Sequence, residues 1–430
     1  MKTFIYDEFT PEDMAMMQAL YSRSGQSVEE HAKKVQQSGS GKFMERYYVG
    51  YGHASIADCG STTVFIEGVS MLVAKAVQDW PLYSGQETSS RYIDMSKQAI
   101  IDPVKSKASK AILDKWMNFY VKSQPAVEAH LKAKYAMKEG EDPAVYQRAI
   151  NARVFDIMRG FLPAGATTQL SWHTNLRQAH DKLALLKYYP LKEVKDVAQE
   201  IHTKLKTKYA YSFGHKEYPE QEKYRKLIAE KYTYYVEQKQ TDKFKFSTNI
   251  KNSSLEQYKE IIKKRPVKTN LPLFLGELGN VTFEFLLDFG SFRDVQRHRN
   301  GVCRMPLLTT KFGFQEWYLE QLPEAVRKEG QALIKEQIKA IKALKASKEE
   351  TQYYVAMGFN VTCKVTYALP AAVYTMELRS GKLVHATLRK IAHQMHAGMK
   401  KLFPNLVLHP DLDKDDWDIR RGLQDIKEKK

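Results

Sequence analysis

The residues best suited to chemistry are three adjacent cationic or titratable side chains in the second half of the chain. Arg297, His298 and Arg299 close a predicted helix over 289–298. Three consecutive side chains cannot share one helix face, so at least one projects away from any packed surface. Because a guanidinium group can grip phosphate oxygens in bidentate fashion, the triplet suits a pyrophosphate. The alternative interpretation is a helix C-terminus whose cations complement the helix dipole.

Two further polar segments lie in the first half. The turn SGQETSSRY over 84–92 combines a glycine, small hydroxyl residues and Arg91, and such a turn can donate several hydrogen bonds to one phosphate. His53 precedes a predicted strand over 62–69, where a neutral imidazole could contact a cofactor or cap the next element. Taken alone, each segment is also typical of an ordinary structural role.

Composition restricts the class of protein. With 430 residues, the chain has room for roughly two to four domains. It is 43% hydrophobic and 27% charged, which argues against wholesale disorder or a disulfide scaffold. The net charge of +17 favours anionic partners such as nucleotides. The lysines fall mainly on helical stretches such as 333–348, which is typical of a solvated face, and no nucleic-acid module is visible, so nucleic acid is not the partner we expect.

The sequence also predicts a compartment. No apolar run approaches the ~20 residues that span a bilayer, and the N-terminus becomes acidic instead of building a signal-peptide core. We therefore expect a cytoplasmic protein with no membrane partner. Cys59, Cys303 and Cys363 are far apart and show no metal-ligand spacing, which predicts reduced thiols and no metal site.

The elements that must position these residues are mostly helical. Apolar residues at helical spacing predict long helices over 11–23, 27–38, 103–135, 191–210, 254–264, 323–348 and 384–402. Runs rich in β-branched and aromatic residues predict strands over 62–69, 166–172, 281–289 and 359–367. The two kinds of element mix without regular βαβ alternation, which favours an α+β fold.

The order of the elements repeats. Each half gives a strand, a helix, a polar or Arg-rich turn, a long helix, a second strand and closing helices. The lysine- and tyrosine-rich stretch between the halves contains few aliphatic residues. We therefore predict two related domains in tandem, over 1–215 and 251–430, joined by a linker over 216–250.

Several motifs together resemble the flavin-dependent thymidylate synthases, whose signature is RHRxxSxNxxSxRY. GHASIADCGSTTVFIEGVS over 52–70 is followed by the SGQETSSRY turn, and RHR stands at 297–299. GFLPAGATTQLSWHTNLRQAHDKL over 160–183 and TMELRSGKLVHATLR over 375–389 resemble later family segments. The resemblance implies two tandem family-like domains, each with a small, mostly antiparallel sheet and long helices.

The signature is divided between the halves. The first half reads VQDW over 77–80 in place of RHR but keeps Glu87, Ser89 and Arg91. The second half keeps RHR but loses the SxRY portion. Random decay would erase residues without regard to the other half, whereas these losses do not overlap. The halves are therefore interpreted as complementary.

The resemblance implies a role for each matched residue. The FAD-binding residues would be His53, Asn175, Arg177, Arg297, His298 and Arg299. The residues that bind dUMP would be Glu87, Ser89, Arg91, Arg159 and Arg379. Arg379 would also act in catalysis, lying at the pyrimidine carbonyls and stabilising negative charge as C5 becomes nucleophilic.

The implied reaction is reductive methylation of dUMP to dTMP, with NADPH and 5,10-methylenetetrahydrofolate as co-substrates. Family members assemble as homotetramers, so a fused chain is expected to form a homodimer that reproduces four domain positions. The alternative is a relative that binds flavin, nucleotides or RNA without this activity or with another specificity.

Overall fold

The computed structural model describes residues 2–236 and 244–413, which form two compact units. Unit 1 comprises Met1–Val69, Val73–Glu87 and Thr168–Thr233, and unit 2 comprises Ser70–Leu72, Thr88–Thr167 and Tyr234–Lys430. Residues 88–167 thus belong to the first half of the sequence but pack with the second. The predicted division into 1–215, 216–250 and 251–430 remains a prediction about the sequence repeat, because packing divides the chain differently.

Unit 1 is mostly helical and contains a two-stranded sheet of β1 and β2. Its elements are α1 (Pro11–Tyr21), α2 (Val28–Ser38), α3 (Gly41–Phe43), η1 (Met44–Gly50), α4 (Ala54–Ala57), β1 (Ser61–Ser70), most of α5 (Met71–Gln78), β2 (Thr167–Asn175), α8 (Leu176–Leu186), α9 (Lys192–Lys208) and α10 (Pro219–Tyr232). The predicted linker is therefore partly helical, since α10 lies within it.

Unit 2 is built around a four-stranded antiparallel sheet of order β3-β4-β6-β5. Its strands are β3 (Lys245–Thr248), β4 (Asn280–Asp288), β5 (Gly301–Cys303) and β6 (Asn360–Ala368). Its helices are α6 (Lys107–Lys134), α7 (Pro143–Met158), η2 (Arg159–Phe161), α11 (Asn252–Glu256), α12 (Lys259–Lys264), η3 (Leu273–Leu278), α13 (Phe289–Val295), α14 (Glu316–Glu320), α15 (Glu324–Ala343), α16 (Lys348–Thr351), η4 (Gln352–Tyr354), α17 (Leu369–Arg379) and α18 (Ala386–Leu402).

The pairing register of the central strands β4 and β6 sets the position of Asp288, where the candidate site begins. β4 and β6 pair along their whole length, from Asn280 opposite Ala368 to Asp288 opposite Asn360. Helices α17 and α18 pack against these strands. The approach of α18 to β3 is close at Gly398, where an added Cβ would lie 3.0 Å from the Phe246 ring.

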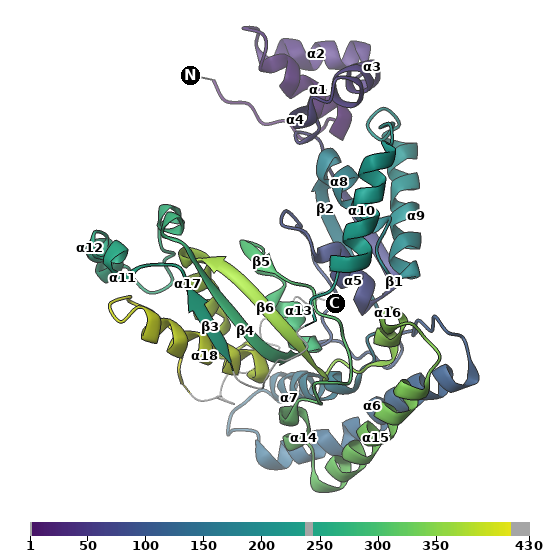
Figure 1. Cartoon of the computed structure of the whole chain (residues 1–430), viewed down its shortest axis with the longest axis vertical. Coiled ribbons are helices and arrows are strands. Elements are labelled where there is room, and N and C mark those ends of the chain that lie inside the picture. The colour runs from purple at the N-terminus through teal and green to yellow at the C-terminus, as the bar shows by residue number, and fades with distance from the viewer. Residues whose placement is uncertain (1, 237–243, 414–430) are drawn as a thin grey trace. The chain divides into compact units, whose positions relative to one another are not determined.

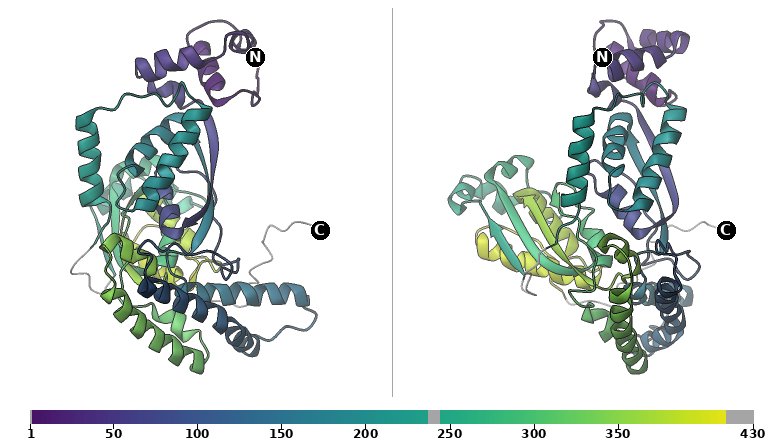
Figure 2. Two further views of the ribbon diagram at one scale, coloured as in Figure 1. Left: turned by 90° about the vertical axis from the view of Figure 1, so that its right-hand side faces the viewer. Right: turned by 45° about the vertical axis from the view of Figure 1, so that its right-hand side comes forward.

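Two long helices of unit 2 run side by side, α6 and α15 (Figures 1 and 2). Ser106 caps α6 by accepting the Ser109 N–H at 3.0 Å. Trp116 of α6 is fully buried and donates its indole N–H to the Tyr354 carbonyl at 2.9 Å. Segments from both halves of the sequence therefore share one core.

The predicted α+β class is confirmed. The predicted strands correspond to β1, β2, β4 and β6, while the helix predicted over 254–264 divides into α11 and α12. Within residues 2–236 and 244–413, no helix combines the length and the apolar character needed to cross a bilayer.

Candidate functional site: an arginine cluster in unit 2

Helix α13 positions the centre of the site. Asp288, the last residue of β4, caps this helix because its Oδ2 atom accepts the Ser291 N–H at 2.8 Å. Every residue of α13 is buried. The rigid strand-to-helix junction therefore holds Arg293 in place and aims the segment after the helix, where Arg297 lies one turn further on.

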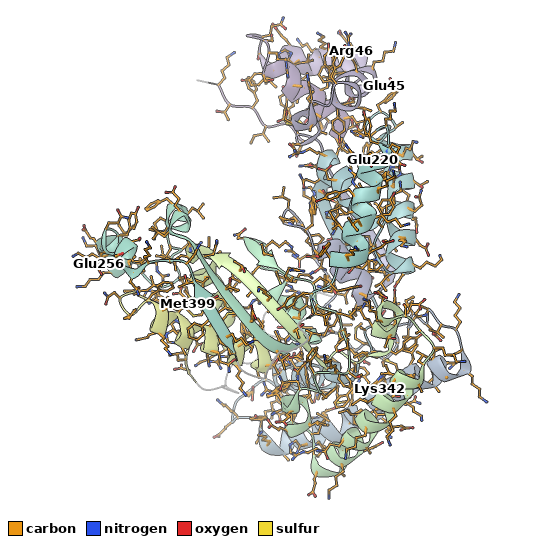
Figure 3. All side chains as sticks on the ribbon, in the orientation of Figure 1. Glu45, Arg46, Glu220, Glu256, Lys342 and Met399 are labelled. Atoms are coloured by element: carbon orange, nitrogen blue, oxygen red, sulfur yellow. The ribbon has the colours of Figure 1, made fainter. Side chains whose placement is uncertain are left out.

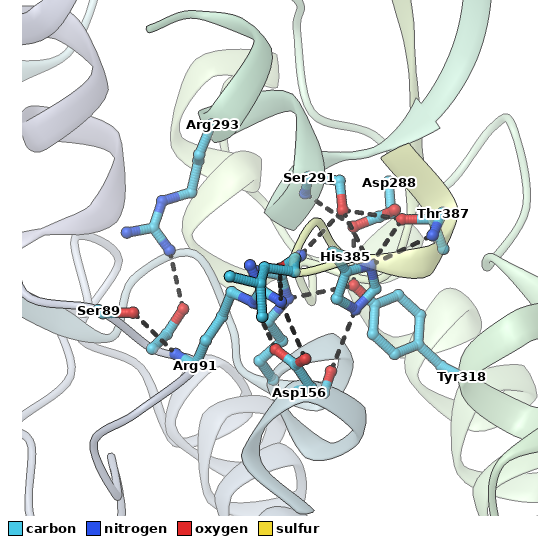
Figure 4. A network of polar contacts seen from close by, with 12 residues as sticks. Ser89, Arg91, Asp156, Asp288, Ser291, Arg293, Tyr318, His385 and Thr387 are labelled. Atoms are coloured by element: carbon cyan, nitrogen blue, oxygen red, sulfur yellow. Dashed lines mark hydrogen bonds and ion pairs between the residues drawn. The ribbon is translucent and has the colours of Figure 1, made fainter. Parts of the chain in front are cut away.

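The SxRY turn from the first half meets this helix. Arg293 donates from Nη1 to the Ser90 Oγ at 3.1 Å, and the two residues are 203 positions apart (Figure 4). Next to it, the Arg91 N–H donates to the Ser89 Oγ at 3.3 Å. Arg91 also donates from Nε and Nη2 to both carboxylate oxygens of Asp156, at 2.5 and 3.0 Å. Because Asp156 is 1% exposed, this bidentate pair is largely shielded from water.

Arg159 lies deeper in the same unit and is 2% exposed. Its Nη2 atom donates to the Ser291 Oγ at 2.8 Å, and its Nε atom lies 3.4 Å from the Tyr318 hydroxyl. Tyr318 donates to Asp288 Oδ2 at 2.7 Å, and burial followed by the nearby Asp288 charge raises the Tyr318 pKa. The neutral hydroxyl groups of Ser291 and Tyr318 thus orient the guanidinium of Arg159.

A buried imidazole completes this network. His385 Nδ1 lies 2.8 Å from the Thr387 Oγ1, and both side chains border Ser291. Burial lowers the pKa of His385, and the charge of Arg159 lowers it further. The ring is therefore neutral, so it adds hydrogen-bonding capacity without another positive charge.

Arg379 binds the end of the RHR segment. Its Nε–H donates to His298 Nε2 at 2.7 Å, and its Nη2 atom donates to the Asp294 carbonyl at 2.9 Å. The remaining Nη1 atom has no hydrogen-bond partner among residues 2–236 and 244–413. Burial, reinforced by Arg379, lowers the pKa of His298 to about 3, so the imidazole accepts as a neutral ring.

Arg297 and Arg299 give the cluster its accessible positive charge. The side chain of Arg297 is 50% exposed, and its Nε atom lies 3.5 Å from Asp294 Oδ1. Burial opposes ionisation of Asp294, but the charges of Arg297 and Arg379 outweigh it and hold the pKa of that carboxyl well below its usual range. Arg299 Nη1 lies 3.4 Å from the Arg297 carbonyl. One carboxylate thus faces several guanidinium groups, which leaves a positive region able to bind an anion.

The remaining FAD-binding candidates lie in unit 1. His53 is exposed and precedes α4, with its ring 6.2 Å from that of Tyr47. Asn175 caps α8 by accepting the Gln178 N–H at 2.8 Å. Arg177 pairs with Asp58 at 2.7 Å, and its side chain is 36% exposed. Asn175 therefore has a structural role already, whereas His53 and part of Arg177 face solvent.

Glu87 lies in unit 1 as well, in an internal ion pair. Its Oε2 atom lies 2.9 Å from Lys75 Nζ, with both side chains at most 2% exposed. Gln78 donates to the same carboxylate at 2.9 Å. This carboxylate is therefore oriented by the helix that precedes the turn.

Of the predicted site residues, unit 2 brings together Ser89, Arg91, Arg159, Arg297, His298, Arg299 and Arg379. Sequence reasoning missed the residues that hold them, namely Asp156, Ser291, Arg293, Tyr318 and His385. One signal was present, because Arg293 and Arg297 are spaced i, i+4 and so share a face of a predicted helix. Cys59, Cys303 and Cys363, all within the described residues, form no disulfide bond with one another.

A family model matches the first part of the chain. Residues 7–209 match the family model described as thymidylate synthase complementing protein. This part of the chain is therefore similar to the thymidylate synthase complementing protein family. The matched range includes SGQETSSRY and the NxR segment at 175–177.

Members of the UPF0159 group are similar over most of the chain. A UPF0159 protein of Chlamydia muridarum is 26% identical over 413 residues, which covers 82% of this chain and 77% of the relative. A UPF0159 protein of Thermoplasma acidophilum is 24% identical over 481 residues, covering 92% of this chain and 94% of the relative.

A solved structure is similar over about half of the chain. Flavin-dependent thymidylate synthase ThyX from Helicobacter pylori, complexed with FAD and dUMP, is 18% identical with a TM-score of 0.30. The likeness covers 48% of this chain and 94% of that one.

Proposed function

We propose that the protein is an FAD-dependent thymidylate synthase that methylates dUMP reductively to dTMP, with NADPH and 5,10-methylenetetrahydrofolate as co-substrates. The family-model match over residues 7–209 supports the proposal. The observation that carries it is the contact between Arg293 and Ser90. It joins the SxRY turn of the first half to the helix that precedes RHR in the second, so the divided signature is reunited within one compact unit.

The arginine cluster fits the phosphate groups of such ligands. Arg297 is half exposed and faces a single carboxylate at 3.5 Å, so its guanidinium can still bind a pyrophosphate oxygen together with Arg299. On this proposal His298 holds Arg379 in place. His53, Asn175 and Arg177, which lie in unit 1, are proposed as further FAD-binding residues. The flavin would supply the hydride chemistry, and the protein would supply position and charge.

For dUMP we propose a phosphate site at Ser89 and Arg91, with Glu87 as a further dUMP-binding residue. Arg91 donates to Asp156 from Nε and Nη2, so the pair fixes the guanidinium where it can meet a phosphate. Arg159 is buried against Ser291 and Tyr318. We therefore propose that Arg159 contributes positive charge near the phosphate without forming a hydrogen bond to it.

Arg379 is the residue we propose for catalysis. His298 and the Asp294 carbonyl hold two of its nitrogens, which leaves Nη1 to donate to a pyrimidine carbonyl. A fixed donor at that oxygen would stabilise the negative charge that develops when C5 becomes nucleophilic. The proposal needs no cysteine nucleophile.

The experiment is an assay of the purified full-length protein. We expect a flavin absorbance spectrum and, with dUMP, NADPH and methylenetetrahydrofolate, dTMP detected by chromatography. Arg379→Ala should retain the flavin and lose dTMP formation, while Lys339→Ala on α15 removes a distant exposed charge as the matched control. Bound FAD with no dTMP in the wild type would refute the synthase proposal and favour a flavin- or nucleotide-binding relative.

A further inference from the structure

A pocket inside unit 1 lies among α8, α9, α10 and the segment before α10. Its volume is about 710 Å³, within the ~300–1,000 Å³ typical of small-molecule sites. Helical spacing explains the lining of α9, because Lys195, His202 and Lys206 recur at i, i+7 and i+11 and so share one face. Figure 3 labels Glu220 near the start of α10, the helix whose first turns line another wall.

The charge on the pocket wall is unbalanced. Lys187 pairs with Glu217 at 2.6 Å and with Glu222 at 3.0 Å. Three other lining lysines have no ion-pair partner among residues 2–236 and 244–413, namely Lys195, Lys206 and Lys216. Unpaired ammonium groups around a concavity raise the local concentration of anions.

Imidazole rings provide a second kind of ligand group. The rings of His180 and His215 lie 4.0 Å apart at 31°, and His202 lines the same pocket. His215 Nδ1 is shielded from solvent and has no hydrogen-bond partner among the described residues. Such a buried polar atom costs free energy unless a ligand or water satisfies it.

The protein environment favours the neutral form of these rings. Burial, followed by the neighbouring His180, lowers the pKa of His215 to about 4. Burial lowers the pKa of His180 as well, and Arg225 lowers it further. A neutral imidazole can donate to one phosphate oxygen through N–H, and a bound anion would offset the cations that now disfavour its protonation.

We propose that this pocket binds a phosphate ester of mononucleotide size, at a site separate from the arginine cluster. Lys195, Lys206 and Lys216 meet the phosphate charge, and His202 and His215 supply directional hydrogen bonds. The volume exceeds what an inorganic phosphate fills, and the tilted pair of His180 and His215 rings together with Tyr218 offers flat faces to a ring. The assignment does not depend on synthase activity.

The test is calorimetric titration of the full-length protein with adenosine monophosphate as the probe. Lys195→Ala/Lys206→Ala should weaken binding at least 10-fold. Lys204→Ala/Lys208→Ala removes two exposed lysines of the same helix that do not line the pocket, and should change affinity less than about twofold, since solvent and salt screen exposed charges outside the pocket. Arg297→Ala/Arg299→Ala should also leave this binding intact, which separates the pocket from the proposed flavin site.

Adenosine, which lacks the phosphate, should not bind, and inorganic phosphate should bind more weakly than the nucleotide. Equal weakening by both lysine pairs would show nonspecific attraction and overturn the proposal. So would loss of binding in the Arg297→Ala/Arg299→Ala protein, inorganic phosphate binding as tightly as the nucleotide, or no binding by the wild type. Circular dichroism melting establishes that each variant is folded; the four lysines are exposed.

Discussion

Arg379 and His298 form a hydrogen bond of 2.7 Å in which the guanidinium Nε–H donates to the imidazole Nε2. The bond requires a neutral ring whose proton is on Nδ1. Protonation of Nε2 would replace an acceptor with a donor and place two buried cations side by side. The position of Arg379 is thus tied to the protonation state of His298.

The hydrogen bond between Arg379 and His298 predicts that the free energy of unfolding depends on pH. The folded pKa of His298 is lowered to about 3, from about 6.5 for an ordinary histidine. Below pH 6.5 the unfolded state therefore binds a proton that the folded state does not, and the folded state loses stability as pH falls. At pH 5 the loss from this group is about 2 kcal/mol relative to pH 8. Urea unfolding should show a smaller loss for His298→Gln, whereas His53→Gln at an exposed ring should follow the wild type.

Loss of the exposed arginines should remove the flavin. Each charge-assisted contact to a phosphate is worth about 1.5–3 kcal/mol, so Arg297→Ala and Arg299→Ala should each weaken FAD binding about 10-fold or more. The double variant should be colourless but should melt as the wild type does. Full flavin occupancy in the folded double variant would refute these two assignments.

The thiols should be dispensable for the chemistry. Cys303→Ser should retain most dTMP formation, while Arg379→Ala should lose it with folding intact. Mass spectrometry of the wild-type protein incubated with dUMP tests for a covalent adduct. An inactive serine variant together with a protein–dUMP adduct would establish a thiol-dependent mechanism.

The Arg91–Asp156 pair should matter for folding as well as for binding. Removing Arg91 takes two charge-assisted hydrogen bonds from a buried carboxylate, so Arg91→Ala should lower the free energy of unfolding by about 1.5–3 kcal/mol. Adding Asp156→Asn should recover part of that loss, because the buried negative charge is gone. Lys192→Ala, which breaks an exposed pair with Asp196, should cost less than about 1 kcal/mol. A similar small effect for Arg91→Ala would show that the pair contributes little.

The divided signature predicts the flavin stoichiometry. Because the two halves retain different residues, FAD titration should saturate at about one FAD per chain, and light scattering should give a homodimer. A fragment of residues 1–215 should fold poorly, since it keeps α6 and α7 but lacks the part of unit 2 against which they pack. Two flavins per chain, or a folded and active fragment, would contradict the proposed division.

The sequence predicts the elements better than it predicts their partners. Alternating apolar residues locate β4 and β6 within a residue or two, because that pattern is a direct consequence of strand geometry. The helix predicted over 254–264 is interrupted at Gln257–Tyr258, which apolar spacing cannot reveal. Helix α7 and the short strands β3 and β5 carry weak patterns and were missed.

In the candidate site, too, the sequence does not predict which residues become partners. The resemblance assigns Arg159 to dUMP, but the sequence does not show its partner Ser291, which lies 132 positions away. Only tertiary structure shows that this guanidinium is buried. Glu87 likewise resembles a free carboxylate in sequence, and Lys75 neutralises it. Spacing predicts which residue types gather in a motif, whereas burial decides which of them remain accessible.

Segments of the two units alternate along the sequence. This order has a consequence for synthesis of the chain. Trp116 donates to the carbonyl of Tyr354, which is 238 residues further along the chain. Arg159 can form its hydrogen bond with Ser291 only after that later residue has been synthesised. While the ribosome makes the intervening segment, α6 can pack against α7 but lacks α15 and Tyr354. At about 5–20 residues per second, that interval lasts on the order of ten seconds or more. Folding of unit 2 on the ribosome must therefore come late, and the nascent chain becomes a natural client for chaperones that shield exposed helices.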